Sequence, residues 1–264
     1  MFHVCEAQDI YDLTRSKEYA NYLMKTKQYD LAIEEWERVI FLEPDNNIAK
    51  KSLIRAYSET DDHDKGIKRI ARLYNSTSQI PNNVGMEYVR LLLLHNDLEE
   101  IEQAKTQIPS LDNDQKEYID LNILLLKSDW DNAKELYDAL PNKENHLFDG
   151  YQKIIEAGIN IKHKSPALAL LFSSIIPGTG KFYTGYYFDG LLSMLMTGFT
   201  GFLAYKGFIV RKEKSVYGWF YAGLAAGFYG GNIVGSVKSV KKYNQLENQK
   251  ILEKVHRLIK SASF

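Results

Sequence analysis

The chain has 264 residues, a net charge of −1, one cysteine and six histidines. A single cysteine excludes an internal disulfide framework, and the histidines are not spaced as metal ligands, so we expect no metal and no other cofactor. Residues 1–164 carry 21 Lys and Arg against 30 Asp and Glu, a balance of −9, and residues 165–264 carry the other 12 and 4, a balance of +8. An acidic part is therefore followed by a basic part.

Residues 1–9 fit two interpretations. Cys5 and Ala7 are small residues at the two positions that a leader peptidase inspects, but the charged start and long apolar run of a signal peptide are missing. The segment is either the remnant of a signal peptide or a disordered terminus.

Residues 10–160 show the pattern of paired amphipathic helices. The first helix and its turn are predicted over Glu18–Tyr29 and the second helix over Asp30–Ile40. This pair resembles the tetratricopeptide repeat (TPR), a helix–turn–helix unit of about 34 residues. The residues that match its signature are Tyr19, Ala20, Leu23, Ala32, Trp36 and Pro44. The resemblance implies that the two helices approach closely at the two alanines.

Further pairs repeat this pattern in a degenerate form. They are predicted around Leu53 and Tyr57, Gly66 to Leu73, Tyr88 to Leu94, Leu98 to Ile108, Tyr118 to Lys127 and Trp130 to Leu140, with a closing helix over His146–Ala157. One pair cannot bury its apolar face alone, so stacked pairs should form a solenoid with a concave groove that binds a protein partner. Lys51 and Arg55 belong to helices that usually line such a groove. They show no clear basic clamp for a peptide carboxylate, and we interpret them as solvated surface.

Residues 165–237 contain 13 of the 17 glycines and seven charged residues. A membrane span needs about 20 mostly apolar helical residues, and residues 186–210 and 216–237 are long enough for two spans joined by a short charged turn. Residues 166–177 are too few to cross, which predicts an interfacial or re-entrant helix. The alternative is a buried hairpin of a soluble protein, in which an uncharged run of this length is difficult to place.

A glycine-rich motif precedes the first span. Its residues are Pro177, Gly178, Gly180, Tyr183, Gly185, Asp189 and Gly190. A nucleotide-binding phosphate loop needs an earlier glycine and a Ser or Thr after the lysine, and both are missing around Lys181. The motif resembles instead the P-G-x-G-x-x-Y-x-G signature of small two-span bacterial membrane domains of the TM2-like type, which implies topology and packing without chemistry. Proline ends a helix, glycine permits a bend, and we expect Tyr183 at the membrane interface.

Four glycines of the second span, Gly223, Gly227, Gly231 and Gly235, recur at intervals of four residues. Small residues allow helices to approach closely in lipid. The row therefore predicts a helix-packing surface.

Residues 238–264 form a basic segment with apolar residues at helical spacing, which predicts an amphipathic helix. It lies either on the membrane or against the repeats, and its basic residues favour the membrane, since anionic headgroups attract them. No aromatic platform accompanies these residues, which argues against nucleic acid.

The predicted fold is all-α, with a TPR-like helical solenoid, a transmembrane helical hairpin and an amphipathic tail helix. No nucleophile–base pair or complete phosphate loop supports an enzyme, and we expect no small-molecule substrate. The predicted function is that of a non-catalytic adaptor or scaffold, anchored in the bilayer, that recruits a protein partner. The alternative is a subunit or assembly factor of a membrane complex that uses the glycine-rich hairpin as its binding surface.

The predicted location is the bacterial inner membrane. The positive-inside rule places both termini in the cytoplasm, because the tail carries more Lys and Arg than the turn. A leader at the N-terminus would place the repeats on the opposite side. We favour the non-cytoplasmic side for the repeats.

Overall fold

The computed structural model describes residues 12–60, 62–211 and 215–264, and these residues form helices and no strand. The all-α fold class is confirmed for this part of the chain. It divides into two compact units: unit 1 consists of the described residues up to Ile159 together with Leu252–Phe264, and unit 2 is Asn160–Ile251. The predicted leader remnant at residues 1–9 and the centre of the predicted turn, residues 212–214, lie outside the described residues.

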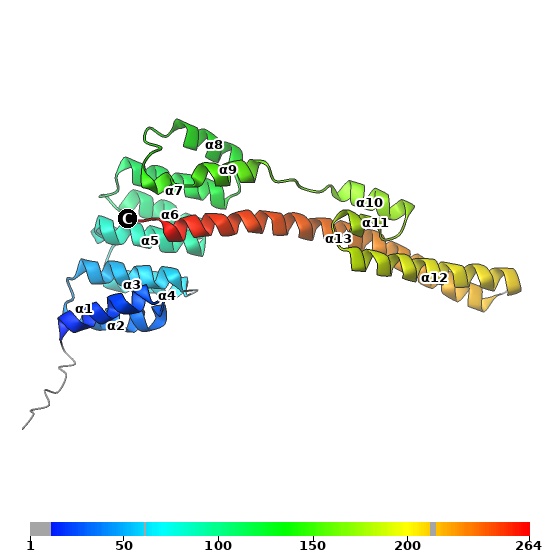
Figure 1. Ribbon diagram of the computed structural model, residues 1–264, viewed down its shortest axis with the longest axis horizontal. Coiled ribbons are helices and arrows are strands. Elements are labelled where there is room, and N and C mark those ends of the chain that lie inside the picture. The colour runs from blue at the N-terminus through cyan, green and yellow to red at the C-terminus, as the bar shows by residue number, and fades with distance from the viewer. Residues whose placement is uncertain (1–11, 61, 212–214) are drawn as a thin grey trace, which may run out of the picture. The chain divides into compact units, whose positions relative to one another are not determined.

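Unit 1 is built from helices that follow one another in the chain, each packed against the next (Figure 1). Their bounds are α1 Leu13–Lys25, α2 Tyr29–Leu42, α3 Asn47–Glu59, α4 His63–Leu73, α5 Asn82–His95, α6 Leu98–Gln107, α7 Asn113–Leu126, α8 Trp130–Ala139 and α9 Tyr151–Ile159, with short 3-10 helices η1 Thr77–Gln79 and η2 His146–Phe148. All predicted helix pairs of this region are present as helices.

The first pair buries most of its signature residues. Four of the six are in the core: Ala20, Leu23, Ala32 and Trp36. Tyr19 is 51 % exposed and stacks on Tyr22 instead of entering the core. Pro44 lies exposed in the turn between α2 and α3. The expected close approach therefore involves the two alanines, both of which are fully buried, and does not involve the tyrosine.

Helix α5 is the innermost helix of unit 1. Every residue from Val84 to Leu94 is buried, and the helix packs against α3, α4, α6 and α7. A helix that is apolar all round belongs inside a protein, and this one also buries two charged residues, Glu87 and Arg90.

The closing helix predicted over His146–Ala157 is divided in the structure. Gly150 has φ 82°, in the left-handed region that glycine adopts most easily. It separates η2 from α9, so a short 3-10 turn precedes a helix that begins at Tyr151.

Unit 2 contains α10 Pro166–Ile175, α11 Thr179–Tyr183, α12 Tyr187–Arg211 and most of α13, which spans Val216–Ser261. Helix α11 packs against both α10 and α12. Among the described helices only α12 is long and apolar enough to cross a membrane, over Tyr187–Val210, and 17 % of that stretch is buried. The expected second span at residues 216–237 is less apolar than α12, because tyrosine, glycine and polar residues interrupt its apolar residues.

Helix α13 does not end where the predicted second span ends. It continues through Val237 to Ser261 as one helix, because no proline or left-handed glycine interrupts it. Its last turns, from Leu252, belong to unit 1. Of the two placements considered for the tail, the structure therefore has these residues packed with the helical repeats, and the preference for the membrane is wrong for them.

Candidate functional site

The end of α13 needs partners for its main chain, because the last four carbonyl groups of a helix have none inside it. In unit 1 these partners are basic side chains of α3 and α5. We call Lys51, Arg55 and Arg90 the basic cluster, and residues 252–264 the terminal segment.

Arg90 is the centre of the basic cluster and is fully buried. Its Nε donates to the main-chain oxygen of Ile259 at 3.0 Å, and its Nη2 donates to the main-chain oxygen of Ala262. Its Nη1 pairs with the carboxylate of Glu87, one turn earlier on α5. Each of the three guanidinium nitrogens thus has a partner, which is a carboxylate for Nη1 and a carbonyl group of the terminal segment for Nε and Nη2.

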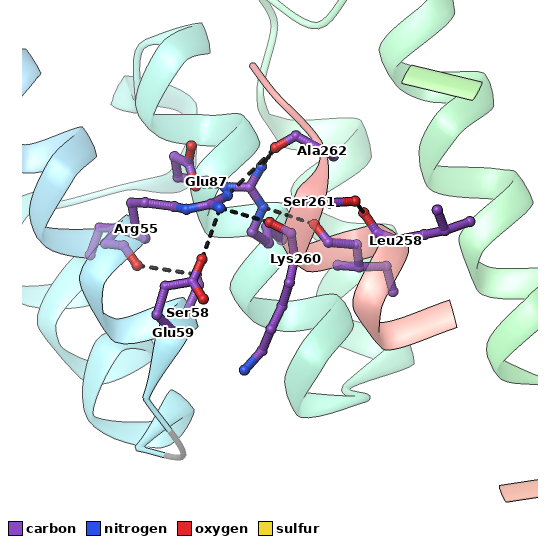
Figure 2. A network of polar contacts seen from close by, with 11 residues as sticks. Arg55, Ser58, Glu59, Glu87, Leu258, Lys260, Ser261 and Ala262 are labelled. Atoms are coloured by element: carbon purple, nitrogen blue, oxygen red, sulfur yellow. Dashed lines mark hydrogen bonds and ion pairs between the residues drawn. The ribbon is translucent and has the colours of Figure 1, made fainter. Parts of the chain in front are cut away.

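Arg55 and Lys51 approach the same helix end from α3. Figure 2 shows the Arg55 guanidinium directed at the terminal segment, where Nη2 donates to the main-chain oxygen of Lys260 at 2.7 Å and Nη1 lies 3.5 Å from that of Ala262. Glu59 holds this guanidinium from the other side at 2.8 Å. Lys51 donates to the main-chain oxygen of Phe264.

Apolar and aromatic contacts complete the site. The Phe264 ring lies edge-on to the Tyr118 ring at 5.5 Å and stacks under the guanidinium of Arg90 at 4.3 Å. Val255 and Ile259, one turn apart on α13, are fully buried. Arg90 is thus enclosed, whereas the hydrogen bonds of Arg55 and Lys51 are partly buried.

The charges of the site match the helix dipole. The C-terminal end of a helix carries a partial negative charge, which nearby cations stabilise, and three cations of α3 and α5 meet it here. The carboxylate beside them is strongly affected by its surroundings: burial raises the pKa of Glu87 to about 7, and the positive charges of Arg55 and Lys51 act against this rise.

The basic cluster binds main-chain oxygens of the terminal segment. Two of its side chains also pair with carboxylates, Arg90 with Glu87 and Arg55 with Glu59, and every bond to the terminal segment ends on a main-chain oxygen. Among the described residues no group of His, Cys, Asp and Glu is arranged to hold a metal ion.

The interpretation of Lys51 and Arg55 as solvated surface is wrong, because both bind the terminal segment. Arg90 was not predicted. The sequence signal that could have indicated it is a pair of opposite charges, Glu87 and Arg90, three residues apart within an otherwise apolar helix.

The glycine-rich motif of unit 2 forms a tight turn that packs on α13. Gly178 has φ 96°, and its N–H donates to Oδ1 of Asn232 at 3.0 Å. The N–H of Gly180 donates to Oγ of Ser173 at 3.0 Å, and this hydroxyl is 2.6 Å from that of Ser236. A Cβ at either glycine would collide with backbone atoms. Gly178 therefore permits a close approach to α12, and Gly180 permits close packing of α11 on α10 and α13.

The remaining motif residues continue this packing. Tyr183 accepts a hydrogen bond from the N–H of Ser165 at its hydroxyl, so its ring secures the start of α10. Gly185 turns the chain with φ 85°, and Gly190 is buried against the Phe182 ring. Asp189 is exposed in the first turn of α12. Pro177 lies in the turn after α10.

Three of the four glycines in the row of α13 do not pack against another helix in the part of the chain that the structure describes. A Cβ at Gly223, Gly227 or Gly231 would meet nothing within 4 Å, whereas one at Gly235 would lie 3.2 Å from Cε of Lys181. The helix packing predicted for the row is therefore not found at Gly223, Gly227 and Gly231 among the described residues. Close contacts between α12 and α13 occur at Gly207 and Gly218 instead. That the glycine row packs against a second molecule stays a prediction.

Comparisons with known proteins give no further guide to the site: no family model, no curated protein and no solved structure matches the chain.

Proposed function

We propose that the protein is a non-catalytic adaptor, anchored in a membrane, that recruits a protein partner at the bilayer. The observation that carries this proposal is the exposed apolar surface of α12. Leu195, Phe199, Phe202 and Ile209 are each between 58 % and 63 % exposed. Contiguous apolar surface of this kind marks a membrane or protein contact, and the length of α12 suits the hydrocarbon core of a bilayer.

The proposed membrane domain is a hairpin in which residues 216–237 of α13 cross beside α12. Two features support it. The Phe208 and Trp219 rings contact edge to face at 5.3 Å where the two helices are connected, and Trp219, Phe220 and Val234 on α13 are exposed. Exposed aromatic and aliphatic side chains are compatible with lipid, although glycine lowers the hydropathy of this stretch.

For unit 1 we propose a TPR-like solenoid as the recruiting part. Serial packing of helix pairs supports this, as does the complete burial of Ala20 and Ala32 in the first pair. The basic cluster adds a surface that binds main-chain carbonyl groups, which is the chemistry that peptide recognition needs.

Carbonate extraction followed by protease treatment tests the anchor and its orientation. We expect the chain to stay in the membrane pellet. Cleavage of unit 1 as soon as the outer barrier of the cell is breached would place it on the non-cytoplasmic side, as we propose, and cleavage only after the inner membrane is opened would place it in the cytoplasm. A chain that carbonate releases would overturn the proposed anchor.

The second candidate is a subunit or assembly factor of a membrane complex. The open space over Gly223, Gly227 and Gly231 favours it, because a helix of another protein can approach there. Replacing the three glycines by leucine should then abolish a membrane complex while unit 1 stays folded. If the complex survives, the adaptor proposal is favoured.

A further inference from the structure

We propose that the basic cluster is a receptor for helix C-terminal ends, and that the terminal segment is its internal ligand. A partner of the adaptor would be a protein whose helix ends with the same chemistry, and it would have to displace residues 252–264. This inference rests on the proposed function for its biological meaning but not for its test, which uses the purified chain.

The hydrogen bonds of the site support a receptor that accepts more than one sequence. Arg55, Arg90 and Lys51 all donate to main-chain oxygens of the terminal segment. His146 adds a contact of 3.0 Å between its Nε2 and the main-chain oxygen of Ser263. A ligand with other side chains at these positions presents the same acceptors.

The buried side chains define which helix ends fit. Val255 and Ile259 are fully buried one turn apart, and Phe264 fills the space between Tyr118 and Arg90. The expected ligand is therefore an amphipathic helix with two aliphatic residues four positions apart in its last turns, followed by an aromatic residue with the spacing of Ile259 and Phe264. Lys260 and Ala262 contribute main-chain oxygens, as Figure 2 shows, and the Ser261 hydroxyl donates back to the main-chain oxygen of Leu258.

The charge of the site selects a helix end over a helix start. Three cations face the negative end of the dipole of α13, and the carboxylates of Glu59 and Glu87 hold two of them in place. A helix N-terminus would bring N–H groups and a partial positive charge to the same cations, which repel it.

Covalent connection makes the terminal segment a strong competitor, because an intramolecular ligand acts at an effective concentration in the millimolar range, about 10⁻³ M. The structure thus describes a receptor in its occupied, self-inhibited state. A partner gains access when it outcompetes the terminal segment or when the segment is released.

Peptide binding to the full chain in detergent tests the receptor. The probe is a fluorescent synthetic peptide of residues 249–264, amidated at its end so that no added carboxylate contributes. We expect weak binding to the wild-type chain and binding about a hundredfold tighter to Ile259→Asp, whose terminal segment is released. In that background Lys51→Ala with Arg55→Ala should remove binding, whereas Lys65→Ala, on α4 and paired with Asp62, should leave it unchanged.

Equal and weak binding to the wild-type and Ile259→Asp chains would overturn the proposal, as would binding that survives loss of Lys51 and Arg55.

If Ile259→Asp does not fold, hydrogen exchange of the wild-type chain decides between the two outcomes. An excess of isotopically labelled peptide, distinguishable by mass, should increase exchange in residues 255–262 of the chain. Unchanged exchange at saturating peptide would mean that the terminal segment is a fixed part of the core. Neither result depends on whether the chain is anchored in a membrane, so the adaptor proposal is tested separately.

Discussion

The guanidinium carbon of Arg90 lies 4.3 Å from the centroid of the Phe264 ring, which joins the innermost helix of unit 1 to the last described residue of the chain. Burying an arginine is costly unless its charge and its donors are matched. Here Glu87 supplies the charge and the carbonyl groups of Ile259 and Ala262 accept the remaining hydrogen bonds. The core of unit 1 is thus completed by residues that follow unit 2 in sequence.

Replacing Arg90 by methionine should strongly destabilise unit 1, by about 3–5 kcal/mol, because Glu87 would be left buried without its partner. The double variant Glu87→Leu/Arg90→Met should recover part of this loss, since it removes both charges. Hydrogen exchange of α5 amides in the full chain measures the effect. The matched control is Arg69→Met, whose partner Glu37 is partly exposed, and it should cost no more than about 1 kcal/mol. Equal costs for the two single variants would contradict the expectation.

Replacing Phe264 by alanine should loosen the terminal segment. The variant loses the edge-to-face contact with Tyr118 and the cation–π contact with Arg90, each of which contributes about 0.5–1.5 kcal/mol. We expect faster hydrogen exchange in residues 255–262 and a smaller effect on α1 and α2. Phe41→Ala is the control, because that ring is 80 % exposed and its loss should change neither region. A Phe264→Ala chain with undiminished protection would show that the ring does not hold the segment.

The contribution of His256 to the stability of the terminal segment should be lost in mild acid. Burial, and next the charge of Lys260, lower the pKa of His256, while Glu253 acts in the opposite direction. The folded state therefore prefers the neutral ring, so the contribution of His256 to stability is present above its unfolded pKa of about 6.5 and is lost as pH falls below it.

The measurement is the stability of the full chain between pH 7.5 and 5, roughly the range in which an unperturbed histidine titrates. His256→Gln should be less sensitive to acid than the wild type, and the difference between the two isolates this residue from Glu87, whose raised pKa acts with the opposite sign. Parallel curves for wild type and His256→Gln would contradict the assignment.

The helices of unit 1 were predictable because their determinants are local. Apolar residues recur at helical spacing, and cap residues such as Asp112, which forms a capping box with Gln115, mark the boundaries. The division between η2 and α9 was missed, because Gly150 within an otherwise helical pattern does not reveal its left-handed conformation.

The site was not predictable for a different reason. An amphipathic basic helix has the same sequence pattern whether its apolar face meets lipid or other helices, so Val255 and Ile259 do not indicate their partner. The glycine row shows the same limitation. Its spacing suits close helix packing, but only the structure shows that Gly227 faces open space. Long-range contacts such as Arg90 to Ile259 depend on the whole arrangement of unit 1.

The glycines of unit 2 should differ sharply in their tolerance of alanine. Gly178 combines φ 96° with a position at which a Cβ would collide with the backbone of Gly190, so Gly178→Ala should disrupt the turn between α10 and α11. Gly185 has φ 85° and open space around it, so Gly185→Ala should cost only the backbone strain, about 1–2 kcal/mol. Gly231→Ala, in a helix with open space, should stabilise the isolated chain by about 0.5–1 kcal/mol. Thermal unfolding of the three variants in detergent checks this order, and a Gly178→Ala chain as stable as Gly185→Ala would show that the motif does not need its close contact with α12.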